Sequence, residues 1–403
     1  MTSVLQNIRD LPRALTSSAM LSGLLVVVVG YASSLVLVFQ AATKSNIDNA
    51  HLSSWVLVIT IGSGLCSIVM SLWFRQPVIA AWSTPGIVLL SETLVHYPFS
   101  EAIGAYIIAA IAIILLGYSG MFGRIMRLIP QPIVMGMLAG VLINFGLDMF
   151  KSFPQSPVMV FLMLVVFFVM RRLGFRAPTI GALVVGLVIA AFRQEIHLEG
   201  MQLSLAAPVF TAPTFSIGAL LSLALPLFTL ALTGQDAPGQ AVLRNAGYEV
   251  PINKALAVTG IGSLLTAPFG GHGLTLAAIT AAMVTGPEAH PDPDKRYTAG
   301  VATGFWYVIT GIFGATLITL FAGLPIPLIH TISGLALTGA IISSLSASMA
   351  DPFGREGALV AFMCTAASFT LFNVGAPFWG LVFGVLTHLI MTYAKPQFQK
   401  PTA

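Results

Sequence analysis

Charged side chains are rare in this chain, and they lie in short clusters between long apolar runs. Only 18 Lys and Arg and 14 Asp and Glu residues occur among 403. A run of about 20 apolar residues spans the hydrocarbon core of a bilayer, and the chain contains many such runs. An isolated charge at the bilayer centre costs at least about 2.5–3.5 kcal/mol, so any charge left inside a run is a functional candidate. The pattern predicts an all-α polytopic membrane protein.

The apolar runs predict fourteen transmembrane segments, several of them short or interrupted by glycine and proline. Hydrophobic residues make up 57% of the chain, and no stretch of soluble composition is long enough to fold alone. The predicted segments are 18–40, 52–74, 77–94, 100–119, 130–150, 157–171, 177–193, 212–236, 252–268, 270–286, 299–322, 325–348, 356–373 and 375–394.

The cations are distributed unevenly between the two predicted membrane faces. With fourteen segments both termini lie on one face, and the positive-inside rule makes the cation-rich face cytoplasmic. We therefore expect both termini in the cytoplasm, and the net charge of +4 marks a membrane face rather than a nucleic-acid partner. The cation-rich face holds Arg9, Arg13, Arg75, Arg124, Arg127, Arg171, Arg172, Arg176, Arg244, Lys254, Lys295, Arg296, Arg355, Lys395 and Lys400, and the other face holds Lys44, Lys151 and Arg193.

Short motifs recur in the same order in the two halves of the chain. Because seven segments per copy is an odd number, the second copy must be inverted. Inverted repeats with broken helices are typical of secondary transporters, although chance recurrence of proline is an alternative. The matched pairs are 129–133 with 324–328, 177–181 with 376–380, Pro77 with Pro268, and Thr84 with Thr275.

The third segment contains the first predicted break, over residues 76–86. Residues 78–82 read as extended chain between two prolines. Thr84 is a favourable N-cap, and Pro85 suits the first position of a helix that follows. The sequence therefore predicts an extended stretch followed by a half-helix.

The tenth segment contains the second break, over the Gly-Gly-His-Gly run 270–273. Three glycines in four positions prevent a stable helix, so we expect the helix to begin near 274–275. Non-helical backbone at this depth occurs only inside protein or beside a wet cavity. Two half-helix N-termini facing one cavity would form an anion site without any Lys or Arg. The alternative is that the glycines only permit tight helix packing.

Asp236 is the clearest intramembrane carboxylate, at the end of the eighth segment. A carboxylate in a low-dielectric site holds a proton more readily and can carry one near neutral pH. Gln235 beside it offers neutral hydrogen bonds, and His272 can donate to an anion or relay a proton. The alternative for Asp236 is a capping or loop residue already in water.

Several motifs resemble the benzoate/proton symporter family, and the similarity covers almost the whole chain. The motifs lie at 234–239, 243–248, 273–282 and 285–297, and the Glu-Ala-His-Pro-Asp loop within the last is quite specific. The resemblance implies a uracil-permease-like fold with two inverted seven-segment repeats and short β-strands in broken segments 3 and 10. Dimers occur in this fold, so a homodimer is one possible assembly, by analogy alone.

The resemblance also implies a division into domains and a substrate site. A core domain would comprise 18–120 and 212–322, and a gate domain 121–195 and 323–394. The substrate would lie between the two breaks and segment eight, with Tyr31 as a looser aromatic candidate. By position, the implied substrate-binding residues are Tyr31, Ser83, Thr84, Pro85, Gly86, Gln235, Gly271, His272, Gly273, Leu274 and Thr275, and the implied proton-coupling residues are Asp236 and His272.

These observations predict a secondary transporter of a bacterial inner membrane that imports benzoate or a related aromatic monocarboxylate with a proton. No cofactor is expected, and the sequence contains no ATP-binding motif and no metal-ligand or disulfide spacing. A nucleobase/proton symporter and a sulfate-permease-like anion exchanger of the same fold are the alternatives. A membrane-embedded enzyme would need a nucleophile–base pair or a metal cluster, which the lone His and Asp residues do not form.

Overall fold

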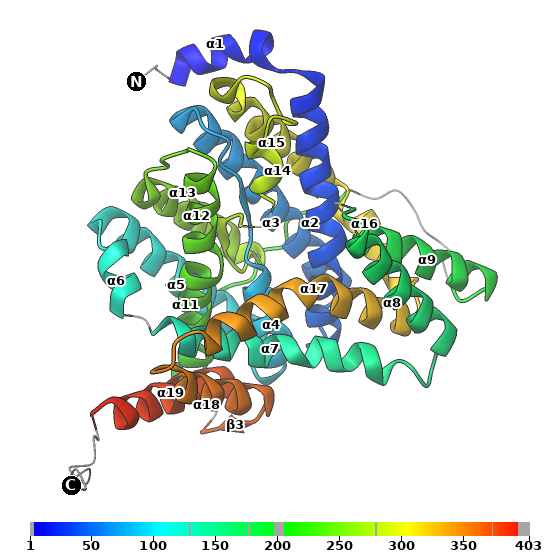
Figure 1. Cartoon of the computed structure of the whole chain (residues 1–403), viewed down its shortest axis with the longest axis vertical. Helices are drawn as coiled ribbons and strands as arrows, with labels where there is room; N and C mark the ends of the chain where they lie inside the picture. Colours follow the sequence, from blue (N-terminus) through cyan, green and yellow to red (C-terminus); the bar gives the residue numbers. More distant parts are fainter. Residues whose placement is uncertain are drawn as a thin grey trace, which may run out of the picture.

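The structure, a computed structural model, describes residues 4–128, 130–175, 178–196, 205–278, 280–372 and 374–393. Most of the described chain is helical (Figure 1). Some sequence predictions fall on positions outside the described residues. These positions are Ile129, Arg176, Ala177, Ile279, Asn373, Lys395, Lys400 and the end of the last segment at 394.

Six described helices are long and apolar enough to cross a membrane by length and composition. A seventh candidate is a bent pair, Pro293–Ile312 with Gly314–Leu320, whose two parts meet at 63°. The predicted count of fourteen is therefore not confirmed, because glycine and proline keep the other apolar helices shorter. The six are α2 (Ser17–Lys44), α3 (Asn49–Phe74), α5 (Phe99–Ser119), α7 (Gln131–Lys151), the composite helix Ile217–Asn245 and α17 (Ile326–Met349).

Shorter elements connect and complete these helices. The α-helices are α1 (Val4–Ala14), α4 (Thr84–Thr93), α6 (Phe122–Leu128), α8 (Pro157–Arg172), α9 (Pro178–Phe192), α13 (Ile252–Thr266), α14 (Ala282–Thr285), α15 (Tyr297–Ile312), α16 (Gly314–Ala322), α18 (Arg355–Ala366) and α19 (Ala376–Tyr393). The 3-10 turns are η1 (Leu94–His96), η4 (Ala267–Phe269) and η5 (Pro293–Lys295).

The composite helix is longer than predicted and contains two π-helical turns. Its parts are α10 (Ile217–Ala219), η2 (Leu220–Ala224), α11 (Leu225–Ala231), η3 (Leu232–Asp236) and α12 (Ala237–Asn245). The predicted end at residue 236, and the alternative that Asp236 is a loop residue, are both wrong. The π turn η3 interrupts the normal hydrogen-bond ladder just before α12, so Pro238, the second residue of α12, occupies a first-turn position where its missing N–H is tolerated.

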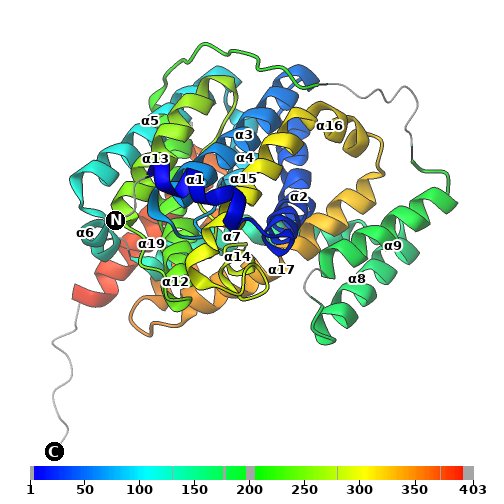
Figure 2. The same cartoon turned by 90° about the horizontal axis from the view of Figure 1, so that it is seen from above.

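The helices pack in two sets. In one set α3 packs against α15, α5 against α13, and α2 against α15 and α4. In the other set α7 packs against α17 and α18, α18 against α19, and α8 against α9. Figure 1 shows the second set in its lower and right-hand parts, and Figure 2 shows α8 and α9 at one edge. The sets meet where α2 contacts α17 and α4 contacts α7.

Close backbone approach holds α3 against α15 at two glycines. A Cβ built on Gly64 would lie 2.6 Å from the carbonyl oxygen of Gly304, and one built on Gly304 would lie 2.5 Å from that of Gly64. Small residues of this kind let membrane helices gain van der Waals contact where lipid supplies no hydrophobic drive. Substitution at either position would therefore separate the two helices.

Four short strands interrupt the helical architecture. β1 (Ala80–Trp82) pairs antiparallel with β2 (Leu274–Leu276), which confirms the predicted strands at the two breaks. β3 (Thr370–Leu371) pairs with β4 (Val374–Gly375) and was not predicted. This second pair lies where the thirteenth segment was expected to run to residue 373, so α18 ends earlier than predicted, at Ala366.

Candidate functional site

The two breaks meet as one hydrogen-bonded unit. The strand register pairs Ala81 with Thr275, and hydrogen bonds extend the ladder beyond both ends. The amide of Ser83 donates to the carbonyl of Gly273 (3.1 Å), and the amide of Ala277 donates to the carbonyl of Ile79 (2.9 Å). The backbone groups of each break are thus partly satisfied by the other break, and the two segments form one structural element.

Side chains satisfy the outer edges of this two-stranded sheet. On β2 the amide of Leu274 donates to Ser263 Oγ (2.7 Å), and the amide of Leu276 donates to Asp236 Oδ1 (2.8 Å). On β1 the amide of Ala80 donates to Ser67 Oγ (2.9 Å). An open strand edge in a membrane must find such partners, because no water is available there. These polar residues explain how a two-stranded sheet persists among apolar helices.

Helix α4 begins at the first break, one residue earlier than predicted. Ser83 is the N-cap, and its hydroxyl oxygen accepts from the amide of Gly86 (3.1 Å). The assignment of Thr84 as the cap is wrong, because Ser83 has the extended backbone that a cap requires and Thr84 is already helical. Pro85 therefore takes the second helical position, and Thr84 Oγ1 lies 3.2 Å from Ser34 Oγ.

The second break differs from the prediction in having no helix at 274–275. These residues are in strand β2, and α14 (Ala282–Thr285) is only one turn long. Pairing with β1 and the side-chain caps on the β2 edge favour extended backbone over a helix start. Thr275 is therefore not equivalent to Thr84, which the repeat comparison had matched. Only the first break presents the N-terminus of a helix of ten residues.

His272 is buried between the breaks, and each of its two ring nitrogens has a hydrogen-bond partner. The indole N–H of Trp55 donates to His272 Nδ1 (2.9 Å), and His272 Nε2 lies 3.2 Å from the carbonyl oxygen of Ser83. Because an indole nitrogen can only donate, Nδ1 must accept and the ring proton must sit on Nε2. A second proton on Nδ1 would face the Trp55 N–H, so this geometry holds His272 neutral.

Asp236 joins the composite helix to the second break. Its side chain is 1% exposed, and Oδ1 accepts from the amide of Leu276. It lies in the π turn η3 with Gln235, which is part-buried. π turns are frequent at functional sites in membrane and soluble helices. Because the Asp236 carboxylate is hydrogen-bonded to the backbone of β2, a change in its protonation state is expected to affect the position of β2.

Tyr31 lies against β1 through an aromatic cluster. Its ring meets Trp82 edge to face at 5.3 Å between centroids, and Trp82 in turn lies 5.7 Å from Tyr307. The hydroxyl of Tyr31 donates to Thr60 Oγ1 (2.8 Å). The structure thus brings the aromatic candidate next to the first break, with its hydroxyl already occupied.

A small cavity of about 20 Å³ lies beside the paired breaks. Gly273 borders it with φ of +130°, and a Cβ built there meets no atom within 4 Å. The cavity walls combine hydroxyl groups with apolar side chains of α5 and α11. The lining residues are Ser83, Tyr106, Ala109, Ala110, Ile113, Leu227, Phe228, Ala231, Ser263, His272, Gly273, Leu274 and Thr275.

Sequence reasoning missed Tyr106 as a member of this site. It lies in the middle of α5, and the only signal was a hydroxyl-bearing residue within an apolar segment. The sequence also missed Trp55, because nothing in its surroundings marks it as the partner of His272. Among the described residues no group of three or more His, Cys, Asp or Glu side chains is placed to hold a metal ion.

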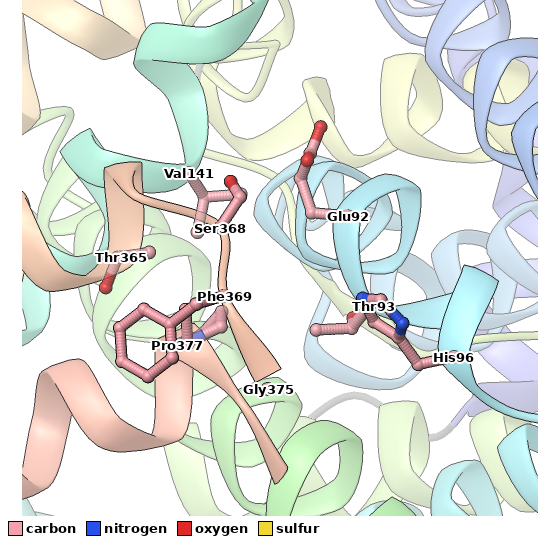
Figure 3. Close-up of a pocket in the computed structure, with 10 residues that line it drawn as sticks. Glu92, Thr93, His96, Val141, Thr365, Ser368, Phe369, Gly375 and Pro377 are labelled. Carbon is pink, nitrogen blue, oxygen red and sulfur yellow. The ribbon is translucent and has the colours of Figure 1, made fainter. Parts of the chain in front are cut away.

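A second cavity, of about 10 Å³, lies at the other end of α4 (Figure 3). Figure 3 shows Glu92, Thr93 and His96 on one side and residues of the segment after α18 on the other. Glu92 pairs with Lys44 at 3.0 Å. The β3–β4 turn is attached here, since the amide of Gly375 donates to Ser222 Oγ (2.8 Å).

Both cavities are far smaller than the several hundred Å³ of a typical small-molecule pocket. Neither cavity has room for a small organic molecule in this structure. Interrupted segments that meet in a helical membrane bundle are typical of membrane transporters. Solved structures support this fold. SLC26A9 aligns with a TM-score of 0.64 and 13% identity over 94% of this chain and 66% of that chain.

The transmembrane domain of the cyanobacterial bicarbonate transporter BicA aligns with a TM-score of 0.55 and 15% identity, over 94% of this chain and 97% of that one.

The chain belongs to the benzoate membrane transport protein family, whose model matches residues 13–390. The expected family resemblance is confirmed, and the chain is a membrane transporter rather than an enzyme.

Two curated relatives align over nearly their whole length. The benzoate membrane transport protein of Acinetobacter baylyi is 37% identical over 378 residues, which cover 94% of this chain and 96% of the relative. The inner membrane protein YdcO of Escherichia coli is 37% identical over 372 residues, which cover 92% and 95%.

Proposed function

We propose that this protein imports benzoate or a closely related aromatic monocarboxylate together with a proton, across a bacterial inner membrane. The name of the Acinetobacter relative supports the substrate. The observation that carries the coupled mechanism is the buried Asp236 carboxylate bonded to the amide of Leu276. It joins a protonatable group directly to the backbone of the paired breaks.

The start of α4 supplies the anion-binding end of the proposed site. A helix N-terminus carries about half a positive charge, which suits a carboxylate. In the first turn of α4 Pro85 has no N–H and the amide of Gly86 is held by Ser83 Oγ, so the amide of Thr84 is the first-turn donor proposed for the anion. Ser83, Thr84, Pro85 and Gly86 form this end. The glycine-rich run 271–275 forms the facing wall, where the missing side chain at Gly273 leaves room for a ligand.

Apolar groups from both helix sets suit the aromatic ring. A Cβ built on Gly234 would lie 3.3 Å from Pro85 and 3.8 Å from Leu138 of α7. Pro85 of the first break and Leu138 of the second helix set therefore both lie close to Gly234. Separation of the two sets at this contact would open an apolar slot next to the helix end, with Gln235 and Tyr31 nearby.

Asp236 is a better candidate for the coupling proton than His272. Both ring nitrogens of His272 already have partners whose geometry requires the neutral ring. Asp236 loses its negative charge on protonation, which makes a substrate anion beside it easier to hold. Burial favours that neutral form when the carboxylate lies away from water. Protonation and anion binding would then reinforce each other.

We further propose the fourteen-segment, inverted-repeat organisation with both termini in the cytoplasm. The antiparallel pairing of β1 with β2 supports an inverted relation between the halves. The starts of α7 and α17 also support a repeat, because α7 follows the N-cap Pro130 and α17 follows the N-cap Pro325. The two helix sets support a core of 18–120 with 212–322 and a gate of 121–195 with 323–394. A homodimer is consistent with this fold.

Uptake of labelled benzoate by the purified protein in liposomes tests the proposed substrate. Protein-free liposomes are the control, because neutral benzoic acid crosses bilayers unaided. We expect unlabelled benzoate and close aromatic acids to compete, while uracil and sulfate do not. Competition by uracil would favour the nucleobase symporter, and competition by sulfate would favour the anion exchanger. The absence of a carboxylate at 270–273 argues against the first alternative.

A further inference from the structure

Tyr106 lines the cavity beside the breaks and carries a buried hydroxyl group that has no hydrogen-bond partner among the described residues. The side chain is 2% exposed and lines the cavity with Ser83 and Gly273. A buried hydroxyl without a partner costs about 1–3 kcal/mol, so a native protein rarely leaves one unsatisfied.

The cavity has the size and the polar walls that a single water requires. A water needs a cavity of at least about 10–15 Å³ and two to four polar partners. The cavity measures about 20 Å³. Besides Tyr106, the hydroxyl of Ser83 lines it. Because Ser83 Oγ accepts from Gly86, its own hydrogen remains available to a further acceptor.

The remaining polar groups of the cavity are committed to the breaks. Ser263 accepts from the amide of Leu274 and donates to the carbonyl of Thr259. His272 is bonded at both nitrogens. The hydroxyl of Thr275, which also lines the cavity, donates to the carbonyl of Ala81 (3.4 Å). Among the described residues that line the cavity, Tyr106 and Ser83 are therefore the side chains whose hydroxyl hydrogens are not already donated to another group. The open space at Gly273 lies on the same cavity wall.

We infer that the cavity binds one water, held by the hydroxyls of Tyr106 and Ser83, and that this water bridges Tyr106 to the transported carboxylate at the start of α4. The link to the carboxylate rests on the proposed function, whereas the water site itself does not. Tyr106 is a positioning residue, because it acts through the water rather than on the substrate.

Tyr106→Phe tests the inference because it removes only the hydroxyl. Tyr118→Phe is the matched control, since Tyr118 lies on the same helix and is 73% exposed. We expect benzoate to bind about fivefold more weakly to Tyr106→Phe and unchanged to Tyr118→Phe, as the loss of one hydrogen bond implies. The KM for uptake should rise while the maximal rate stays the same.

Thermal unfolding without benzoate separates the water site from the proposed function. Deleting an unpartnered buried hydroxyl would raise the melting temperature, whereas deleting one bonded to water would not. A Tyr106→Phe protein that melts above wild type, or that binds benzoate with wild-type affinity, would overturn the inference. Failure of the wild-type protein to bind benzoate would instead overturn the proposed substrate, and the unfolding result would still decide whether the water is present.

Discussion

The two breaks occupy corresponding places in the proposed repeats, yet their structures differ. The first break ends in a serine-capped helix of ten residues, and the second continues as strand β2 toward a helix of one turn. The first can therefore present the positive end of a helix dipole to an anion, while the second leaves open space at Gly273. In the proposed site, the first break would supply the anion-binding end and the second break would supply the open wall at Gly273.

Ser83 is the point at which the two breaks depend on each other. Its amide donates to Gly273, its carbonyl lies 3.2 Å from His272 Nε2, and its hydroxyl caps α4. The cap of one break is thus held in place by the backbone and ring of the other. A substitution in either break is therefore expected to shift Ser83 and, with it, the start of α4 that is proposed to bind the anion.

Gly273→Leu should have the largest effect on this arrangement. At φ of +130° any side chain adds backbone strain of about 1–3 kcal/mol, and a leucine side chain would fill the open space beside residue 273. We expect benzoate binding to fall below detection in a direct binding assay while the protein remains folded.

Gly174→Leu is the matched control for backbone strain. Gly174 also has a positive φ of +79° with no atom within 4 Å of a built Cβ, but it follows α8, in the other helix set. It should retain binding. Wild-type affinity in a folded Gly273→Leu protein would show that the second break is not part of the site.

Ser83→Ala should have a smaller effect, centred on the first break. Loss of an N-cap costs about 1 kcal/mol, which corresponds to about fivefold in an equilibrium constant. We expect benzoate affinity to fall by about that factor and the melting temperature to decrease. Thr84→Val, at the residue that the sequence had favoured as the cap, should have the milder effect on stability. The reverse order in thermal unfolding would mean that Thr84 is the functional cap.

Local sequence rules located the breaks but not their partners. Prolines at 77 and 85 and the glycines of 270–273 were sufficient to predict the interruptions and the extended stretch that became β1. The burial of Asp236 followed from its place after a long apolar run. These features depend on nearby residues, so composition and chain geometry determine them.

Features that depend on distant contacts were mispredicted or missed. The family resemblance predicted a strand in the tenth segment, but the local pattern predicted a helix start at 274–275. The strand β2 forms there because β1, Ser263 and Asp236 satisfy its backbone, and none of these lies beside it in sequence. The composite helix continues past Asp236 because a π turn accommodates Pro238. Tyr106 was missed because an unpaired hydroxyl can be recognised only when its neighbours are known.

The coupling role of Asp236 is the central claim, and gradient-driven uptake tests it most directly. One proton moving with one monoanion transfers no net charge, and membrane potential acts only on net charge, by about 2.3 kcal/mol per charge per 100 mV. In liposomes containing the wild-type protein, an inwardly directed proton gradient should therefore concentrate benzoate faster than in protein-free liposomes, where neutral benzoic acid also follows the pH gradient, and a potential alone should not. Asp236→Asn should accumulate benzoate in response to pH no faster than protein-free liposomes, while retaining benzoate exchange. If Asp236→Asn still concentrates benzoate in response to pH faster than protein-free liposomes do, the coupling proton is carried elsewhere and the coupling role of Asp236 is contradicted.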